Sequence, residues 1–186
     1  MLQNPTEIRL KLRAAGYHPI PISGHDTQAK YGPAAGKAPM ISGWQNLFDQ
    51  TPEQIRAWET SYRDHTNTGI LARHHPALDI DVMDERLVDA VFEFACGWFK
   101  DHPGKLLRRI GQPPKFLIPF RTEKPFTKVV RNLVGPNGQT GKIEFLGDGQ
   151  QYVVHGIHPG THKPYTWPDG ALWDYDDRDL SPPVPL

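Results

Sequence analysis

The chain has 186 residues, with 21 basic and 21 acidic side chains and 38% hydrophobic residues. This length supports one domain, or a core with a small appendage. The single Cys96 excludes an intramolecular disulfide framework and a cysteine-based zinc ribbon. No apolar run reaches the ~18 residues that a membrane span requires, and the N-terminus lacks a signal-peptide pattern. We therefore expect a cytosolic protein with no membrane contact.

The charges are unevenly distributed along the chain, although the net charge is zero. Residues 100–142 carry ten lysines and arginines but only two acids, whereas residues 79–93 carry six acids and one arginine. Residues 169–179 are also acidic, with five aspartates and one arginine. A basic middle segment beside an acidic one suits a polyanionic substrate. The alternative is that these charges scatter over the folded surface and cancel.

The first part of the chain alternates between helix and strand signals. Residues 5–15 predict a short amphipathic helix, and residues 17–22 predict a strand. The glycine- and proline-rich residues 23–43 predict a long loop. Thr51-Pro52-Glu53-Gln54 is typical of a helix start, with Thr51 as the N-cap. Residues 67–72 predict a further short strand.

The next segment, Leu78-Asp79-Ile80-Asp81-Val82, alternates apolar and acidic residues as a half-buried strand does. Asp79 and Asp81 therefore share one face, with their Cα atoms roughly 7 Å apart. Like charges on one face repel, and a divalent cation is the simplest compensation. A carboxylate pair holds one hard cation, or two about 4 Å apart, as in polymerases and nucleases. The alternative is a solvated face of an edge strand.

The remaining elements continue the alternation. We expect a helix over 84–100, strands over 106–110 and 116–120, and a basic loop over 121–141 with an irregular hairpin as the alternative. A strand over 142–146 carrying Glu144 and its partner strand over 151–155 follow. Residues 169–186 predict an acidic, proline-rich tail or linker after a core of residues 1–168. The sum is an α+β fold with a mostly antiparallel sheet, helices on one face and the acidic strand central.

In this order the motifs resemble those of the archaeo-eukaryotic primase superfamily, and most closely its bifunctional DNA primase/polymerase (prim-pol) branch of phages, prophages and plasmids. The resemblance covers about residues 10–168. The matching pieces are Gly16–Pro21, Gly36–Pro39 with Trp44, Asn67–Ile70, Leu78–Asp81, Arg109–Lys115, Ile143–Gln151, Gly156–Pro159 and Tyr165–Trp167. Each piece alone is weak, but the ordered set is fairly specific.

The resemblance implies an RRM-like catalytic module joined to an N-terminal αβ module, with the active cleft between them. The implied activity is template-directed nucleotidyl transfer on DNA, as primer synthesis, primer extension or both. The implied partners are a DNA template and primer, a dNTP or NTP, and a replicative helicase domain or protein. The implied setting is phage or plasmid replication in the cytosol of a bacterial or archaeal host.

The resemblance also implies a metal site. Asp79 and Asp81 match the first superfamily motif and Glu144 the third, so these three residues would hold Mg²⁺ or Mn²⁺. Lys115 stands where the second motif normally ends in a histidine that contacts the phosphates of the incoming nucleotide. A lysine keeps the positive charge, so phosphate binding is preserved. A role of that histidine in proton transfer would not carry over.

Four further residues are expected to bind the nucleotide. Arg109 would neutralise the triphosphate together with Lys115, and Lys37 is an additional candidate. Gln151 and His158, expected on the same hairpin as Glu144, would contact ribose or phosphate. For His158, a turn histidine hydrogen-bonded to backbone is the alternative.

Two other functions use some of the same features. A metal-dependent nuclease or phosphoesterase would also need Asp79, Asp81 and Glu144, although the chain has no HxH, HxD or HExxH spacing. A DNA-binding replication initiator module without catalysis would use the basic residues 100–142 and would tolerate loss of the acids. A globular domain without enzymatic function is the remaining alternative.

Overall fold

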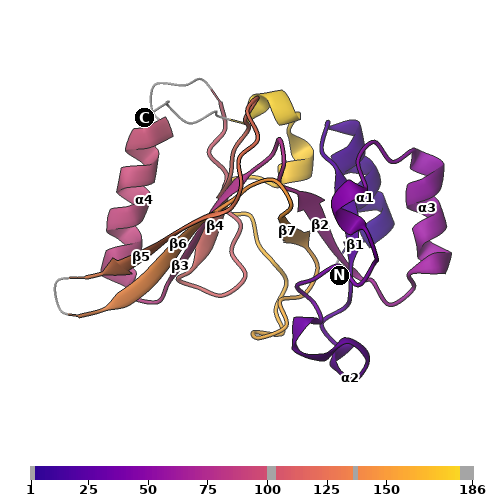
Figure 1. Cartoon of the computed structure of the whole chain (residues 1–186), viewed down its shortest axis with the longest axis horizontal. Coiled ribbons are helices and arrows are strands. Elements are labelled where there is room, and N and C mark those ends of the chain that lie inside the picture. Colours follow the sequence, from indigo (N-terminus) through magenta and orange to yellow (C-terminus); the bar gives the residue numbers. More distant parts are fainter. Residues whose placement is uncertain (1–2, 100–103, 136–137, 181–186) are drawn as a thin grey trace.

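The computed structural model describes residues 3–99, 104–135 and 138–180. In this part of the chain, four α-helices and two antiparallel sheets form a mixed α+β fold, which confirms the predicted class (Figure 1). The helices are α1 (Pro5–Ala14), α2 (Gln28–Tyr31), α3 (Pro52–Ser61) and α4 (Glu85–Phe99). The strands are β1 (Pro19–Ile22), β2 (Asn67–Leu71), β3 (Ala77–Val82), β4 (Phe116–Pro119), β5 (Val129–Val134), β6 (Thr140–Leu146) and β7 (Gln151–His155).

Side-chain caps mark the start of three helices, and the cap at Thr51 confirms the predicted start of α3. The Thr51 hydroxyl accepts a hydrogen bond from the Gln54 N–H, and the Gln54 side chain accepts one from the Thr51 N–H, which completes a capping box at α3. At α4, the Asp84 carboxylate accepts the Leu87 N–H at 2.9 Å. At α1, the Asn4 side chain accepts the Thr6 N–H at 2.8 Å. These local contacts satisfy amide groups that have no partner within the helix.

The strands form two separate antiparallel sheets. One sheet has the order β1-β2-β7, and the other has the order β4-β3-β6-β5. Figure 1 shows α4 beside the four-stranded sheet, with α1 and α3 at the opposite end of the molecule beside the three-stranded sheet. The acidic strand β3 lies inside its sheet, between β4 and β6, so the edge-strand alternative is wrong.

One face of the four-stranded sheet is buried against α4. Leu78, Ile80 and Val82 of β3 are at most 4% exposed and belong to one hydrophobic cluster with Val88 and Phe99 of the helix. Because side chains alternate along a strand, the acidic residues of β3 point away from α4. The predicted division of this strand into an apolar and an acidic face is confirmed.

Strands β3 and β6 pack closely against each other at one end of their pairing. Gly141 of β6 lies opposite Val82 of β3. A Cβ atom at Gly141 would come within 2.6 Å of the Val82 side chain, closer than real contacts allow. The absence of a side chain at this position therefore allows the two strands to pair as they do.

The expected partner of the Glu144 strand is wrong. We expected β7 to form a hairpin with β6, but β7 pairs with β2 in the other sheet. The chain turns sharply after β6, where the Gln150 N–H donates to the Gly147 carbonyl at 3.0 Å. The Gln150 carbonyl then accepts the Ala72 N–H at 3.0 Å, which directs β7 to β2. The predicted turn is present, but the chain passes from one sheet to the other at this turn instead of closing a hairpin.

Two other expectations need correction. Residues 106–110 form isolated bridges instead of a strand, because only Arg109 and Ile110 pair, one with Leu117 and the other with Thr166. Residues 23–43 contain α2 and a 3₁₀ turn at Gly32–Ala34.

The basic stretch 121–141 includes β5, which forms a hairpin with β6, in agreement with the hairpin alternative.

The segment after residue 168 is not a free tail. It contains 3₁₀ turns at Leu172–Asp174 and Asp177–Asp179. Leu172 and Leu180 are fully buried in the same cluster as Ile8 and Leu12 of α1. Residues 169–180 therefore complete the core around α1, because Leu172 and Leu180 pack into this cluster. The predicted tail residues 181–186 lie outside the described residues.

Candidate active site

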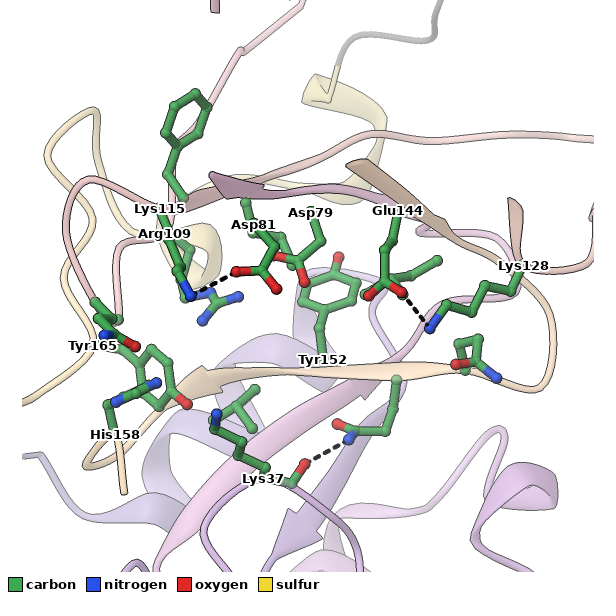
Figure 2. Close-up of a pocket in the computed structure, with 18 residues that line it drawn as sticks. Lys37, Asp79, Asp81, Arg109, Lys115, Lys128, Glu144, Tyr152, His158 and Tyr165 are labelled. Atoms are coloured by element: carbon green, nitrogen blue, oxygen red, sulfur yellow. Dashed lines mark hydrogen bonds and ion pairs between the residues drawn. The ribbon is translucent and has the colours of Figure 1, made fainter. Parts of the chain in front are cut away.

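A cavity of about 350 Å³ separates the two sheets. Figure 2 shows three carboxylates projecting into it from the four-stranded sheet, with Lys37 and His158 on the opposite side. The cavity is lined by all eight residues that the sequence predicted for the site. These are Lys37, Asp79, Asp81, Arg109, Lys115, Glu144, Gln151 and His158. Their functional roles stay predictions, but the fold brings them to one place.

The carboxylates are arranged by the pairing of β3 with β6. Asp79 lies directly opposite Glu144, and Asp81 lies opposite Lys142. Burial raises the pKa of Asp79; the positive charge of Arg109 opposes this shift, and the carboxylates of Glu144 and Asp81 add to it. Asp79 is thus the carboxylate whose charge is least well compensated by the surrounding protein.

Lysine side chains neutralise the other two carboxylates. Lys115 Nζ lies 2.6 Å from Asp81 Oδ1, and Lys128 Nζ lies 2.8 Å from Glu144 Oε1. Lys142 Nζ lies between them, 3.2 Å from Glu144 Oε1 and 3.9 Å from Asp81 Oδ2. Burial acts to raise the pKa of Glu144, but the hydrogen bonds from Lys128 and Lys142 outweigh it and hold that pKa below its ordinary value.

Arg109 is held by an aromatic ring instead of a carboxylate. Its guanidinium carbon lies 4.8 Å from the centre of the Tyr165 ring, within cation–π range. Its backbone is fixed by two hydrogen bonds with Leu117, at 2.8 and 2.9 Å. Nearby Gly111 lies so close to the ring that a Cβ atom would be 2.5 Å from Tyr165 Cε1. The guanidinium is therefore positioned at the cavity without being neutralised by an ion pair in the described residues.

The opposite wall is positive or neutral. Gln151 Nε2 donates to the Lys37 carbonyl at 2.7 Å, and this ties β7 to the loop that carries Lys37. His158 Nδ1 accepts the backbone N–H groups of Gly160 and Thr161, at 3.2 and 3.1 Å. Burial, followed by the charges of Lys37, Arg109 and Lys115, lowers the pKa of His158 to about 4. The turn-histidine geometry is present, and in the neutral ring the remaining nitrogen, Nε2, carries the proton.

Three residues at the site were missed. Lys128 and Lys142 had been counted only as part of the basic stretch, and Tyr165 only as part of a motif. A signal for Lys142 existed, because it stands two residues before Glu144 and so shares its face of the strand. Nothing local indicates Lys128 or Tyr165. The alternative that the basic charges scatter over the folded surface is wrong for four residues, because these lie together at the site. They are Arg109, Lys115, Lys128 and Lys142.

The carboxylate set suits a divalent cation. Within the described residues, no three acidic, histidine or cysteine side chains stand close enough together to enclose a metal ion in their present positions. Lysine ammonium groups take the cation positions beside Asp81 and Glu144 instead. The donors are all oxygen atoms, which are the ligands that Mg²⁺ and Mn²⁺ prefer. The donor chemistry of Asp79, Asp81 and Glu144 therefore fits such an ion, whereas their present positions do not enclose one.

Residues 9–185 match the sequence model of a family described as bifunctional DNA primase/polymerase, N-terminal. No curated protein matches the chain. In the described residues, no helix combines the length and the apolar character needed to cross a membrane.

Proposed function

The chain belongs to the bifunctional DNA primase/polymerase family, and we propose that it catalyses template-directed nucleotidyl transfer on DNA through a two-metal site. Membership supports a DNA primase/polymerase role in replication, with DNA and nucleotides as substrates. The phage or plasmid setting and the helicase partner stay predictions.

One observation carries the proposal. Three carboxylates on neighbouring strands share a cavity of about 350 Å³ with the basic side chains of Lys37, Arg109, Lys115 and Lys128. This arrangement suits a nucleoside triphosphate, because its phosphates need cations and its reacting centre needs metal ligands in the same cavity. Positive charge from several separate segments also suits a triphosphate better than a single phosphodiester bond.

The residues divide into two groups by role. Asp79, Asp81 and Glu144 would hold Mg²⁺ or Mn²⁺. Such ions, when bound, activate the primer 3′-hydroxyl as Lewis acids and neutralise charge on the leaving pyrophosphate. Arg109 and Lys115 bind the triphosphate oxygens and hold the α-phosphorus in line with the hydroxyl.

The opposite wall orients the rest of the nucleotide. Lys37 contributes a further positive charge to the phosphates, from a loop fixed by Gln151. His158 stays neutral near pH 7, because burial holds its pKa at about 4. It therefore acts as a hydrogen-bond donor through Nε2 to ribose or phosphate, and not as a permanent charge.

The test is extension of a labelled primer on a template with dNTPs and either Mg²⁺ or Mn²⁺. We expect metal-dependent extension by the wild type and its loss in Asp79→Ala and Asp81→Ala. Asp89→Ala, on the exposed surface of α4, is the matched control and should extend normally. Extension that survives both site substitutions contradicts the assignment of the site.

The same reactions separate the rival functions. Degradation of the DNA in the absence of nucleotides would instead support a nuclease. Salt-sensitive DNA binding without extension, unchanged in both variants, would support a binding module.

A further inference from the structure

The pairing of β3 with β6 places four side chains at the corners of a square on the open face of the sheet. Asp79 lies opposite Glu144, and Asp81 lies opposite Lys142. Three corners are therefore carboxylates and the fourth is a lysine. Because the register fixes all four Cα positions, this lysine is as much a part of the metal-binding surface as the acids are.

Lys142 differs from the other two lysines at the site in where its backbone lies. Lys115 and Lys128 reach the acids from segments just before β4 and β5. Lys142 belongs to a strand that is paired on both sides, so its ammonium group remains within reach of Asp81 and Glu144. The distances of 3.9 and 3.2 Å to these two carboxylates show that it already bridges them.

We propose that Lys142 competes with a divalent cation for Asp81 and Glu144, and so keeps metal binding by the nucleotide-free protein weak. The proposal rests on the proposed function, since it takes the three acids as metal ligands. An ammonium group and a metal ion at the same carboxylate oxygens repel each other. Loss of the lysine charge therefore strengthens metal binding, and loss of a charge far from the site does not.

The test measures metal binding directly, without catalysis. Mn²⁺ is titrated into the nucleotide-free protein, and the free aqua ion is quantified by its electron paramagnetic resonance signal. For Lys142→Gln we expect a dissociation constant at least about tenfold lower than that of the wild type. Lys142→Arg, which keeps the charge, should stay close to the wild type.

Lys11→Gln is the matched control, because it removes one exposed charge on α1, which packs on the three-stranded sheet. It should leave the Mn²⁺ dissociation constant unchanged. Asp79→Ala in the Lys142→Gln background should abolish the gain in affinity, which ties the gain to this site. An equal gain in Lys11→Gln would overturn the proposal, because net charge alone would then explain it.

A measurement on the wild type covers the case in which Lys142→Gln fails to fold. The wild type is labelled with ¹³C at the lysine Cε atoms, and the Lys142 signal is assigned by its loss in Lys142→Arg. We expect this signal to shift on addition of Mg²⁺, as the ion displaces the ammonium group. An unmoved signal at saturating Mg²⁺ would overturn the proposal.

Failure of this proposal is distinguishable from failure of the proposed function. Metal-dependent primer extension by the wild type, together with equal Mn²⁺ affinity in Lys142→Gln, would overturn the competition alone. Absence of both Mn²⁺ binding and extension would overturn the two together.

Discussion

Asp79 and Glu144 face each other directly across the β3–β6 ladder. Like charges in this position destabilise a sheet by about 0.2–1 kcal/mol. Asp79 is also the more poorly compensated of the two, because burial raises its pKa, whereas hydrogen bonds from lysines lower that of Glu144 against the effect of burial. The folded protein thus keeps a charge arrangement that is unfavourable for stability.

Replacement of Asp79 by Asn should therefore separate stability from activity. Asn has nearly the same shape and removes the charge repulsion, so the melting temperature should stay equal or rise by about 1–4 °C. Primer extension should fall by at least about 100-fold, because one of the three proposed metal ligands is lost. Asp89→Asn on the surface of α4 should change neither quantity. A large loss of stability in Asp79→Asn would contradict this interpretation.

Lys115 should act mainly through its positive charge. Lys115→Ala should lower kcat/KM for the dNTP by about 100-fold in steady-state extension, since one preorganised cation is lost. Lys115→His should recover part of this loss at pH 6 but little at pH 8, because histidine has an ordinary pKa of about 6.5. The comparison is the ratio to the wild type at each pH. A ratio for Lys115→His that does not depend on pH would contradict a charge-based role.

Tyr165 should position Arg109 through its ring and not through its hydroxyl. Tyr165→Phe keeps the ring beneath the guanidinium and should leave the KM for dNTP close to that of the wild type. Tyr165→Leu loses the cation–π contact and should raise KM by about 3- to 30-fold, with a smaller effect on kcat. If Tyr165→Phe is as impaired as Tyr165→Leu, the hydroxyl is the important group.

Acid should destabilise the fold through buried histidines. Burial, with the charge of Arg9 adding to it, lowers the pKa of His155 to about 4. Between pH 6.5 and 4 the unfolded state therefore binds more protons, and this histidine costs about 1.4 kcal/mol of stability for each pH unit by which the pH falls. In urea unfolding, His155→Leu should lose about 2 kcal/mol less than the wild type between pH 7 and pH 5.

The matched control for this pH dependence is the exposed His74. His74→Leu should keep the pH dependence of the wild type, because the His74 side chain is exposed to solvent in the folded protein as it is in the unfolded chain. Equal losses in His155→Leu and the wild type would show that His155 is not protonated on unfolding.

Replacement of Leu172 by Ala should show that the chain after residue 168 belongs to the core. Leu172 is fully buried in the cluster that contains Ile8 and Leu12, so Leu172→Ala should cost about 2–5 kcal/mol of unfolding free energy. Val134→Ala, at a side chain that is 75% exposed, is the control and should cost little. A small loss in Leu172→Ala, measured by chemical denaturation, would mean that this segment is dispensable.

The parts of the fold that depend on local signals were predictable. The cap at Thr51 acts within a few residues, and the two-residue period of β3 determines which face carries Asp79 and Asp81. These features need no knowledge of distant parts of the chain. The eight residues predicted for the site come from short motifs, and they line one cavity, while their roles stay predictions.

The parts that failed depend on long-range pairing. Whether β7 joins β6 or β2 is decided by the turn geometry at Gly147 and by the bond from Ala72 to Gln150, neither of which a strand pattern encodes. Leu172 and Leu180 are isolated apolar residues in an acidic segment, and only the open side of the α1 cluster makes them core residues. Lys128 reaches Glu144 because β5 follows the edge of β6, which is likewise a tertiary fact.

Gly141 does not line the cavity, but it influences the site because it determines how β6 aligns with β3. A slip of β6 by one residue would turn Glu144 toward the apolar α4 side, and a slip by two would place Lys142 opposite Asp79. Only a residue without a side chain fits against Val82. Either of these slips would place a residue with a side chain opposite Val82, and the resulting clash disfavours it. The missing side chain of Gly141 thus fixes the spacing of the three acids from a position one register step from Asp81 and three residues before Glu144.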